Sequence, residues 1–380
     1  MGSNFGRQLK ISVFGQSHSE GIGVVADGFP AGFKIDRQRL SSFMQRRAPG
    51  HSPFATPRKE ADELHILSGI VGDVTCGAPF CAVIQNTDTR SADYRSVQHI
   101  PRPAHADFSA QQKFHGYQDV RGGGHFSGRL TAPLTAAGGI AVQMLESQGI
   151  FVGTHISSIA DIRDQNFDPV LVCPDDFEKL RVKHFPCLCD EAAQQMQQAI
   201  LQARSDGDSV GGTIECAVTG MPAGIGSPMF DGLENRIAAA VFAIPAVKGI
   251  EFGSGFAGAA VRGSENNDAF TTDAAGNIRT RTNHHGGILG GISSGMPILF
   301  RIAMKPTPSI GREQKSVNMK TKQEVSLTVG GRHDPCVVVR AAVCVEAVTA
   351  LTLLDMLLSE GQWQAPAAFE DQTVVKVKDL

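Results

Sequence analysis

Apolar residues recur every three or four positions in several stretches of the chain, which is the spacing of one buried helix face. This spacing predicts helices over Thr131–Gln148, Glu191–Arg204, Glu234–Ala243 and Glu346–Ser359. The helix Glu191–Arg204 is polar apart from a stripe of Ala193, Met196, Ile200 and Ala203. Asp190 is its expected N-cap, and Pro245 is expected to end the helix that begins at Glu234.

Short runs rich in β-branched and aromatic residues lie between these helices and predict strands. The runs are Lys10–Phe14, Ala82–Ile84, Gly212–Val218, Val247–Phe252, Ile298–Ile302 and Gln372–Val377. Strands and helices alternate irregularly, so the pattern favours an α+β or α/β sandwich over a regular barrel.

A repeated five-residue motif is consistent with a chain built from two related halves. GFPAG at Gly28–Gly32 recurs 192 residues later as GMPAG at Gly220–Gly224, and each follows an apolar run, Ile22–Ala26 or Ile214–Val218. Two unrelated strand–turn units would explain so short a match equally well. No low-complexity linker or block of like charge marks a domain boundary.

Composition then narrows the class of protein. The 380 residues carry a formal net charge of −3, which argues against a general nucleic-acid binder. The 42 glycines predict tight turns and backbone held close to a ligand. Eight scattered cysteines and the absence of a signal-peptide core or a long unbroken apolar run predict a reduced, cytoplasmic protein without a membrane partner. A secreted protein that has lost its leader is the alternative.

The usual nucleotide, zinc-protease and hydrolase signatures are absent from the sequence, and neither His284–His285 nor Cys187–Cys189 has the ligand spacing of a metal site, so no metal is expected. Instead, Arg, Lys and His gather on Gly- and Pro-rich segments. These are Phe14–Gly21, Gln45–Gly50, Arg102–Asp107, Arg121–Arg129, Asn283–Gly295, Lys305–Ser309 and Gly331–Cys336. In a nearly neutral chain this segregation of charge predicts a polyanionic small-molecule ligand. The glycines at 122–124, just before a helix, suit an anion site.

In order and spacing these segments resemble the chorismate synthase family from about Phe14 to Ala350. The matching motifs are FGQSHS, RPAHADF, RGGGHFSGR, IPAVKGIEFG, GGILGGISSGMP and GRHDPC. The resemblance implies an α+β fold, a single large β–α–β sandwich with pseudo-repeated halves, in one catalytic domain over residues 1–380. It also implies a homotetramer.

The resemblance implies a carbon–oxygen lyase of aromatic amino acid biosynthesis. Its reaction would be the 1,4-anti-elimination of phosphate from 5-enolpyruvylshikimate 3-phosphate, giving chorismate, with reduced FMN as cofactor. Whether the protein reduces FMN with NADPH or depends on an outside reductant stays open. Two other readings also stay open: another reduced-flavin enzyme acting on a phosphorylated acid, and a catalytically impaired paralogue that still binds flavin and anions.

By the same resemblance, His18, His105 and Asp334 are the expected catalytic residues. The substrate anions would be bound by Arg47, Arg102, Arg129 and Arg332, and Arg46 or Arg58 would replace a further family arginine that aligns with Pro53. The expected FMN contacts are His125, Phe126, Ser127, Pro245, Ala246, Gly290, Lys305, Pro306, Thr307, Pro308, Ser309 and Arg332.

The chain departs from the family pattern beside these residues. Gln16 and Ser19 flank Ser17–His18 where Glu and Gly are common, and Ala104 precedes His105 where Gly is common. His125 and Leu130 stand where many members have Arg and Glu. Arg102, Arg129, His18, His105 and Asp334 keep the family pattern, so we expect an active enzyme.

Overall fold

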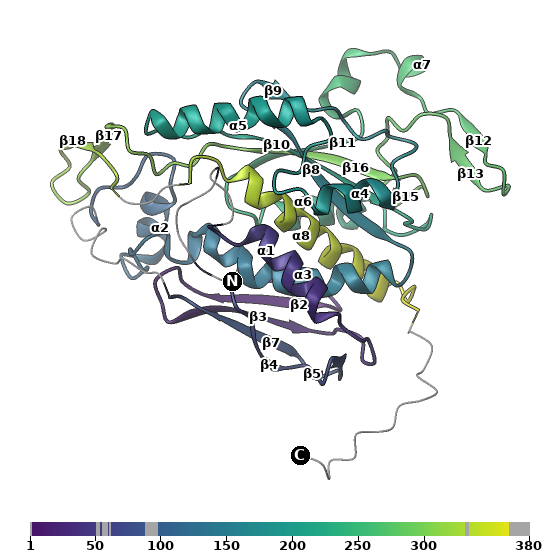
Figure 1. Cartoon of the computed structure of the whole chain (residues 1–380), viewed down its shortest axis with the longest axis horizontal. Helices are drawn as coiled ribbons and strands as arrows, with labels where there is room; N and C mark the ends of the chain where they lie inside the picture. Colours follow the sequence, from purple (N-terminus) through teal and green to yellow (C-terminus); the bar gives the residue numbers. More distant parts are fainter. Residues whose placement is uncertain are drawn as a thin grey trace, which may run out of the picture.

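Two antiparallel five-stranded sheets enclose a layer of helices in the computed structural model, which describes residues 2–50, 54, 60, 62–87, 98–330 and 334–364 (Figure 1). The first sheet runs, edge to edge, through β1 (Asn4–Phe5), β2 (Lys10–Gly15), β3 (Gly21–Asp27), β7 (Phe80–Gln85) and β4 (His65–Ser68). The second runs through β11 (Val247–Phe252), β16 (Ile298–Met304), β10 (Gly212–Thr219), β8 (Phe151–Ile159) and β9 (Ile162–Arg163).

Three helices fill the space between the sheets: α1 (Arg37–Arg47), α3 (Thr131–Glu146) and α8 (Val338–Ser359). The remaining helices are α2 (Asp107–Phe114), α4 (Pro174–Arg181), α5 (Asp190–Ser205), α6 (Leu233–Val241) and α7 (Gly263–Asn266). Small hairpins complete the described chain: β5–β6 (Ile70–Val71, Val74–Thr75), β12–β13 (Phe270–Thr272, Ile278–Thr280), β14–β15 (Ile288–Leu289, Ile292–Ser293) and β17–β18 (Gln314–Val317, Glu324–Leu327). The expected α+β sandwich is confirmed.

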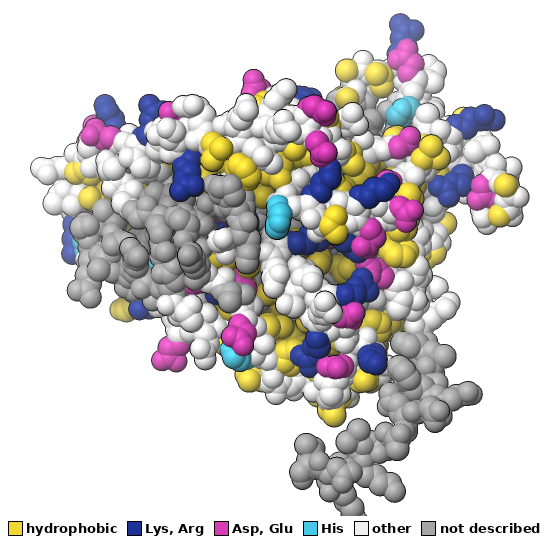
Figure 2. Space-filling model, viewed as in Figure 1, with side chains coloured by type: hydrophobic (Ala, Val, Ile, Leu, Met, Phe, Trp, Pro, Cys, Tyr) yellow, Lys and Arg dark blue, Asp and Glu magenta, His cyan; other side chains and the backbone are white. Residues whose placement is uncertain are grey.

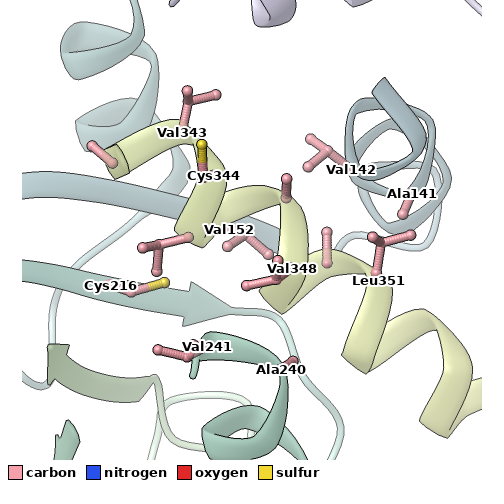
Figure 3. Close-up of a cluster of buried hydrophobic side chains, with 14 of the residues drawn as sticks. Ala141, Val142, Val152, Cys216, Ala240, Val241, Val343, Cys344, Val348 and Leu351 are labelled. Carbon is pink, nitrogen blue, oxygen red and sulfur yellow. The ribbon is translucent and has the colours of Figure 1, made fainter. Parts of the chain in front are cut away.

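The core is centred on α8, which meets side chains from α3, α6, β8 and β10 (Figure 3). Because α8 lies between layers, it is apolar on nearly every face. By length and composition it could cross a membrane, yet 94% of its most apolar window is buried inside the protein. This burial is the pattern of a core helix. On the surface in Figure 2, acidic and basic side chains are interspersed, in keeping with the small net charge.

The predicted elements are found with shifted bounds. Asp190 is the first residue of α5 and Cys189 its N-cap, so the capping prediction was wrong. The helix expected from Glu346 begins eight residues earlier, at Val338, and Arg46–Arg47, expected in a loop, form the last turn of α1. The strand predicted over Gln372–Val377 lies outside the described residues.

The two GxPAG segments occupy equivalent places in the two sheets. Gly28 directly follows β3 and has φ +107°, and a Cβ there would lie 2.1 Å from the carbonyl oxygen of Gln8, just before the paired strand β2. Gly220 directly follows β10 and has φ +77°, and its Cβ would lie 1.9 Å from the carbonyl oxygen of Gly149, just before the paired strand β8. This shared geometry supports two related halves over two unrelated turns.

Gly138 allows α3 and α8 to approach closely. A Cβ at Gly138 would lie 2.3 Å from Cβ and 2.5 Å from Cα of Ala347, whereas one at Gly139 would meet mainly flexible side chains, with Leu40 Cδ1 at 2.7 Å. Gly138→Ala is therefore expected to lower the free energy of unfolding by about 1–3 kcal/mol through overpacking, despite the better helix propensity of alanine. Gly139→Ala, the matched control, is expected to lose less unfolding free energy than Gly138→Ala. Urea unfolding of both variants measures the two losses. Equal losses would contradict the close-packing argument.

Candidate active site

A cavity of about 910 Å³ lies beside the N-terminal ends of α3 and α8. Its walls come from segments that are far apart in the sequence: Ser17–His18, Arg102–Ala106, the stretch from Gly122 to Thr131, Ala243–Lys248, and the loop that runs into α8. The volume is in the range of about 300–1,000 Å³ that is usual for small-molecule sites.

Most of the residues singled out from the sequence line this cavity. They are His18, Arg47, Arg102, His105, His125, Phe126, Ser127, Arg129, Pro245, Ala246, Lys305, Thr307, Pro308, Ser309 and Asp334. Pro306 lies between two lining residues without being one. Arg332, Pro53 and Arg58 lie outside the described residues.

Two predicted residues lie elsewhere. Arg46 turns away from the cavity, and its guanidinium group binds the Glu346 carboxylate, with Nη1 donating to Oε2 at 2.8 Å. The buried carboxylate of Glu346 needs a paired cation. Arg46 therefore neutralises a charge in the core and does not contribute to the cavity. Gly290 is exposed in the β14–β15 turn, with φ +62° followed by +85° at Gly291. A two-residue hairpin turn requires such positive φ angles, which accounts for these glycines without a ligand.

Arg102 and His105 converge on one carboxylate, that of Asp107. Asp107 accepts hydrogen bonds from Arg102 at the backbone N (2.9 Å), Nε (2.8 Å) and Nη2 (2.8 Å). Nδ1 of His105 lies 2.6 Å from Asp107 Oδ1. Burial opposes ionisation of Asp107, but the hydrogen bonds from Arg102 and His105 hold its pKa well below the usual value. Asp107 therefore stays a carboxylate at any working pH.

Arg47 and Arg129 form a second cationic wall with two acids that sequence reasoning missed. Arg129 Nε lies 3.1 Å from Glu60, and its Nη1 contacts Asp62. Arg47 is only 1% exposed and faces Asp62 at 3.2 Å, yet its guanidinium nitrogens have no hydrogen-bond acceptor among the described residues. Burial lowers the pKa of Arg47 to about 10, against the attraction of Asp62, so the group remains charged near neutral pH. Such a cation is suited to an incoming anion.

Asp334 lies four residues before the first residue of α8 and has only one of its two carboxylate oxygens hydrogen-bonded among the described residues. Its Oδ2 accepts from Arg340 Nη1 at 2.9 Å, while Oδ1 has no hydrogen-bond partner among the residues that the structure describes. Burial raises the pKa of Asp334, although the Arg340 charge opposes the rise. Arg340, which sequence reasoning also missed, donates from Nε to the Arg47 carbonyl oxygen at 2.9 Å and so connects Asp334 to the wall formed by Arg47 and Arg129.

His18 packs against the glycine loop. A Cβ at Gly122 (φ +61°) would lie 2.3 Å from His18 Cε1, so only glycine fits there. His18 is 6% exposed, and its Nδ1 lies 3.0 Å from Ser17 Oγ. The glycine loop thus holds a buried imidazole at the cavity wall, and the described chain continues through Ser127 and Arg129 into α3.

Ala104 adopts a left-handed backbone conformation, with φ +59°. Alanine is disfavoured there because its Cβ crowds the following carbonyl. Ala104→Gly is therefore expected to raise the free energy of unfolding by about 0.5–1 kcal/mol while keeping the His105 geometry. Chemical denaturation beside steady-state kinetics tests this, with Ala110→Gly, at a buried position inside α2, as the control that should lose stability. A less stable Ala104→Gly variant would contradict the backbone argument.

The comparisons with known proteins agree on one family. The family model described as chorismate synthase matches residues 9–358. The chain is 47% identical over 370 residues to the chorismate synthase of Lancefieldella parvula, covering 94% of this chain and 97% of that protein. It is 43% identical over 364 residues to the one from Methanocella arvoryzae, covering 95% of each. A crystal structure of chorismate synthase matches with a TM-score of 0.73 at 26% identity, covering 93% of both chains.

Proposed function

The chain belongs to the chorismate synthase family, and we propose that the cavity beside α3 and α8 is where it converts 5-enolpyruvylshikimate 3-phosphate into chorismate and inorganic phosphate. One observation carries this assignment. Three arginines, two histidines and one carboxylate that lie far apart in the sequence all line the same cavity: Arg47, Arg102, Arg129, His18, His105 and Asp334.

The charges of the cavity match the chemistry of the elimination. The substrate brings one phosphate and two carboxylates, and cations aimed at the phosphate stabilise the charge that develops as its C–O bond breaks. We assign that task to Arg102, with His105 beside it as the proton donor to the departing oxygen. Asp334, with its available Oδ1, assists removal of the ring proton at the other end of the reacting system. Arg47 and Arg129 hold the carboxylates.

The cavity wall also fits reduced FMN. Thr307 Oγ1 is buried there without a hydrogen-bond partner among the described residues, as a hydroxyl awaiting an acceptor such as a phosphate oxygen would be. Lys305 and Ser309 lie beside it, with His125, Phe126, Ser127, Pro245 and Ala246 along the same cavity. These residues would hold reduced FMN, which would supply electron density to the breaking C–O bond without a net redox change.

The test is an anaerobic assay of chorismate formation with the enolpyruvyl substrate, FMN and dithionite, beside controls that lack FMN or reductant. Dithionite makes the result independent of whether NADPH or an outside reductant serves the protein in the cell. We expect many turnovers that require reduced flavin without consuming it. Stoichiometric consumption of reductant would indicate another flavin enzyme, and flavin binding without turnover an impaired paralogue.

We propose further that residues 1–380 act as one catalytic domain in a cytoplasmic homotetramer. The large cavity supports the first part, because it takes residues from the first sheet's loops, from α3 and from the segments beside the second sheet. The tetramer and the location rest on the family alone. Analytical ultracentrifugation at micromolar concentration tests the assembly, and a monomer there would overturn it.

A further inference from the structure

We propose that Asp107 is a positioning residue that fixes both the Arg102 fork and the tautomer of His105. The inference rests on the proposed function, in which Arg102 and His105 act on the departing phosphate. Asp107 itself is not assigned a contact with the substrate. It acts through the two side chains that it holds at the cavity wall.

The Arg102 guanidinium is held along one edge by this carboxylate. Nε donates to Oδ2 and Nη2 to Oδ1, both at 2.8 Å, which is the two-pronged arrangement that a planar guanidinium makes with a carboxylate. Two further contacts fix the plane of the group: Nη2 donates to the Gly122 carbonyl oxygen at 2.7 Å, and Nη1 to Ser309 Oγ at 3.2 Å. Asp107 thus sets the direction in which the guanidinium presents its charge.

The His105 tautomer follows from the same carboxylate. Nδ1 lies 2.6 Å from Asp107 Oδ1 and 3.1 Å from Arg102 Nη2. A guanidinium can only donate and a carboxylate can only accept, so the Nδ1 proton satisfies the contact with Asp107 and not the one with Arg102. The contact with Asp107 is the shorter one and therefore places the proton on Nδ1. Nε2 is then the ring atom that takes up a second proton to form the imidazolium and gives that proton to the departing oxygen, after which the ring returns to the Nδ1–H form.

An aspartate–arginine pair away from the cavity provides a control. Asp73 Oδ1 accepts from Arg37 Nε at 3.0 Å, and Arg37 Nη2 donates to the Gly72 carbonyl oxygen at 3.1 Å. Neither Asp73 nor Arg37 lines the large cavity among the described residues. This pair therefore keeps an aspartate–arginine contact without a neighbouring imidazole.

The experiment compares Asp107→Asn with Asp73→Asn. An asparagine can turn its amide toward Nδ1 and donate, which permits the other tautomer. We expect Asp107→Asn to lower kcat by about 100-fold or more, as loss of the orienting carboxylate does in other histidine–carboxylate pairs, and to raise KM because Arg102 loses its clamp. Asp73→Asn is expected to keep both constants within about twofold. Equal effects in the two variants, or an unchanged kcat in Asp107→Asn, would overturn the proposal.

A spectroscopic measurement tests the same inference without any turnover. Side-chain ¹⁵N spectra of the wild-type histidines, with His105 identified by its absence in His105→Gln, report which ring nitrogen carries the proton. We expect the Nδ1–H form in the wild type and its loss in Asp107→Asn. An Nε2–H form in the wild type would overturn the proposal. The spectra also separate the positioning role of Asp107 from the proposed reaction, because a protein that forms no chorismate can still show the Nδ1–H tautomer of His105.

Discussion

Asp334→Asn is expected to lower kcat by about 100- to 10,000-fold, the range usual for loss of a general base. An amide cannot accept a proton, while its oxygen and shape keep the position that the carboxylate occupies. The structure makes Asp334 suited to that task because Oδ1 has no hydrogen-bond partner among the described residues, and Arg340 holds Oδ2 at 2.9 Å. Binding of substrate and flavin is expected to persist, since neither depends on this proton.

The measurement is single-turnover formation of chorismate beside equilibrium binding of FMN. Asp355→Asn serves as the control for loss of a buried carboxylate at a distance from the cavity. Asp355 is fully buried near the other end of α8 and accepts from the backbone N atoms of Arg7 and Leu9. That variant is expected to lose stability and keep kcat. Near-normal single turnover in Asp334→Asn would remove Asp334 from the chemistry.

The pH dependence of kcat/KM is expected to follow the protonation of Asp334. Burial raises the pKa of Asp334 while the Arg340 charge opposes the rise, so protonation sets in at a higher pH than for an ordinary aspartate. A base works only when deprotonated. The acid limb of the kcat/KM profile therefore reflects a raised pKa, with activity lost as the pH falls through it.

Sequence patterns located the layers of the fold better than the ends of its helices. The helix α5 has a clean apolar stripe, and its predicted bounds differ from the observed ones by one residue at each end. The first two turns of α8, from Val338 to Val345, are apolar on nearly every side and rich in valine, so they show no helical period. The polar helix α1 was missed because its two final arginines precede Pro49–Gly50, which suggests a loop.

The limits of sequence reasoning at the site have a similar physical cause. Arginines and histidines in distinctive motifs were found, but the acids that hold them were not. Glu60 and Asp62 lie in an unremarkable polar stretch and reach Arg129 only through the folded chain. Arg340 is one charge within an apolar helix, and its contact with Asp334 depends on how the segment before α8 folds back on the first turn of that helix. Spacing along the chain does not encode such pairings.

The second large effect is expected at Arg102, where lysine should replace arginine almost as poorly as alanine does. Both variants are expected to lower kcat/KM by about 100- to 1,000-fold, the cost of losing one aligned charge at a developing anion. Lysine retains the charge but has a single donor nitrogen. Arg102 uses Nε, Nη1 and Nη2 at once, on Asp107, Ser309 and Gly122.

Steady-state kinetics of Arg102→Ala and Arg102→Lys check this result, with Arg46→Lys as the matched control. Arg46 neutralises the buried Glu346 and does not line the cavity among the described residues, so its lysine variant should lose stability and keep KM. A normal kcat/KM in Arg102→Lys would show that charge alone is needed there. A raised KM in Arg46→Lys would show that this side chain reaches the substrate after all, because loss of a core ion pair changes unfolding and leaves substrate affinity in the folded protein unaltered.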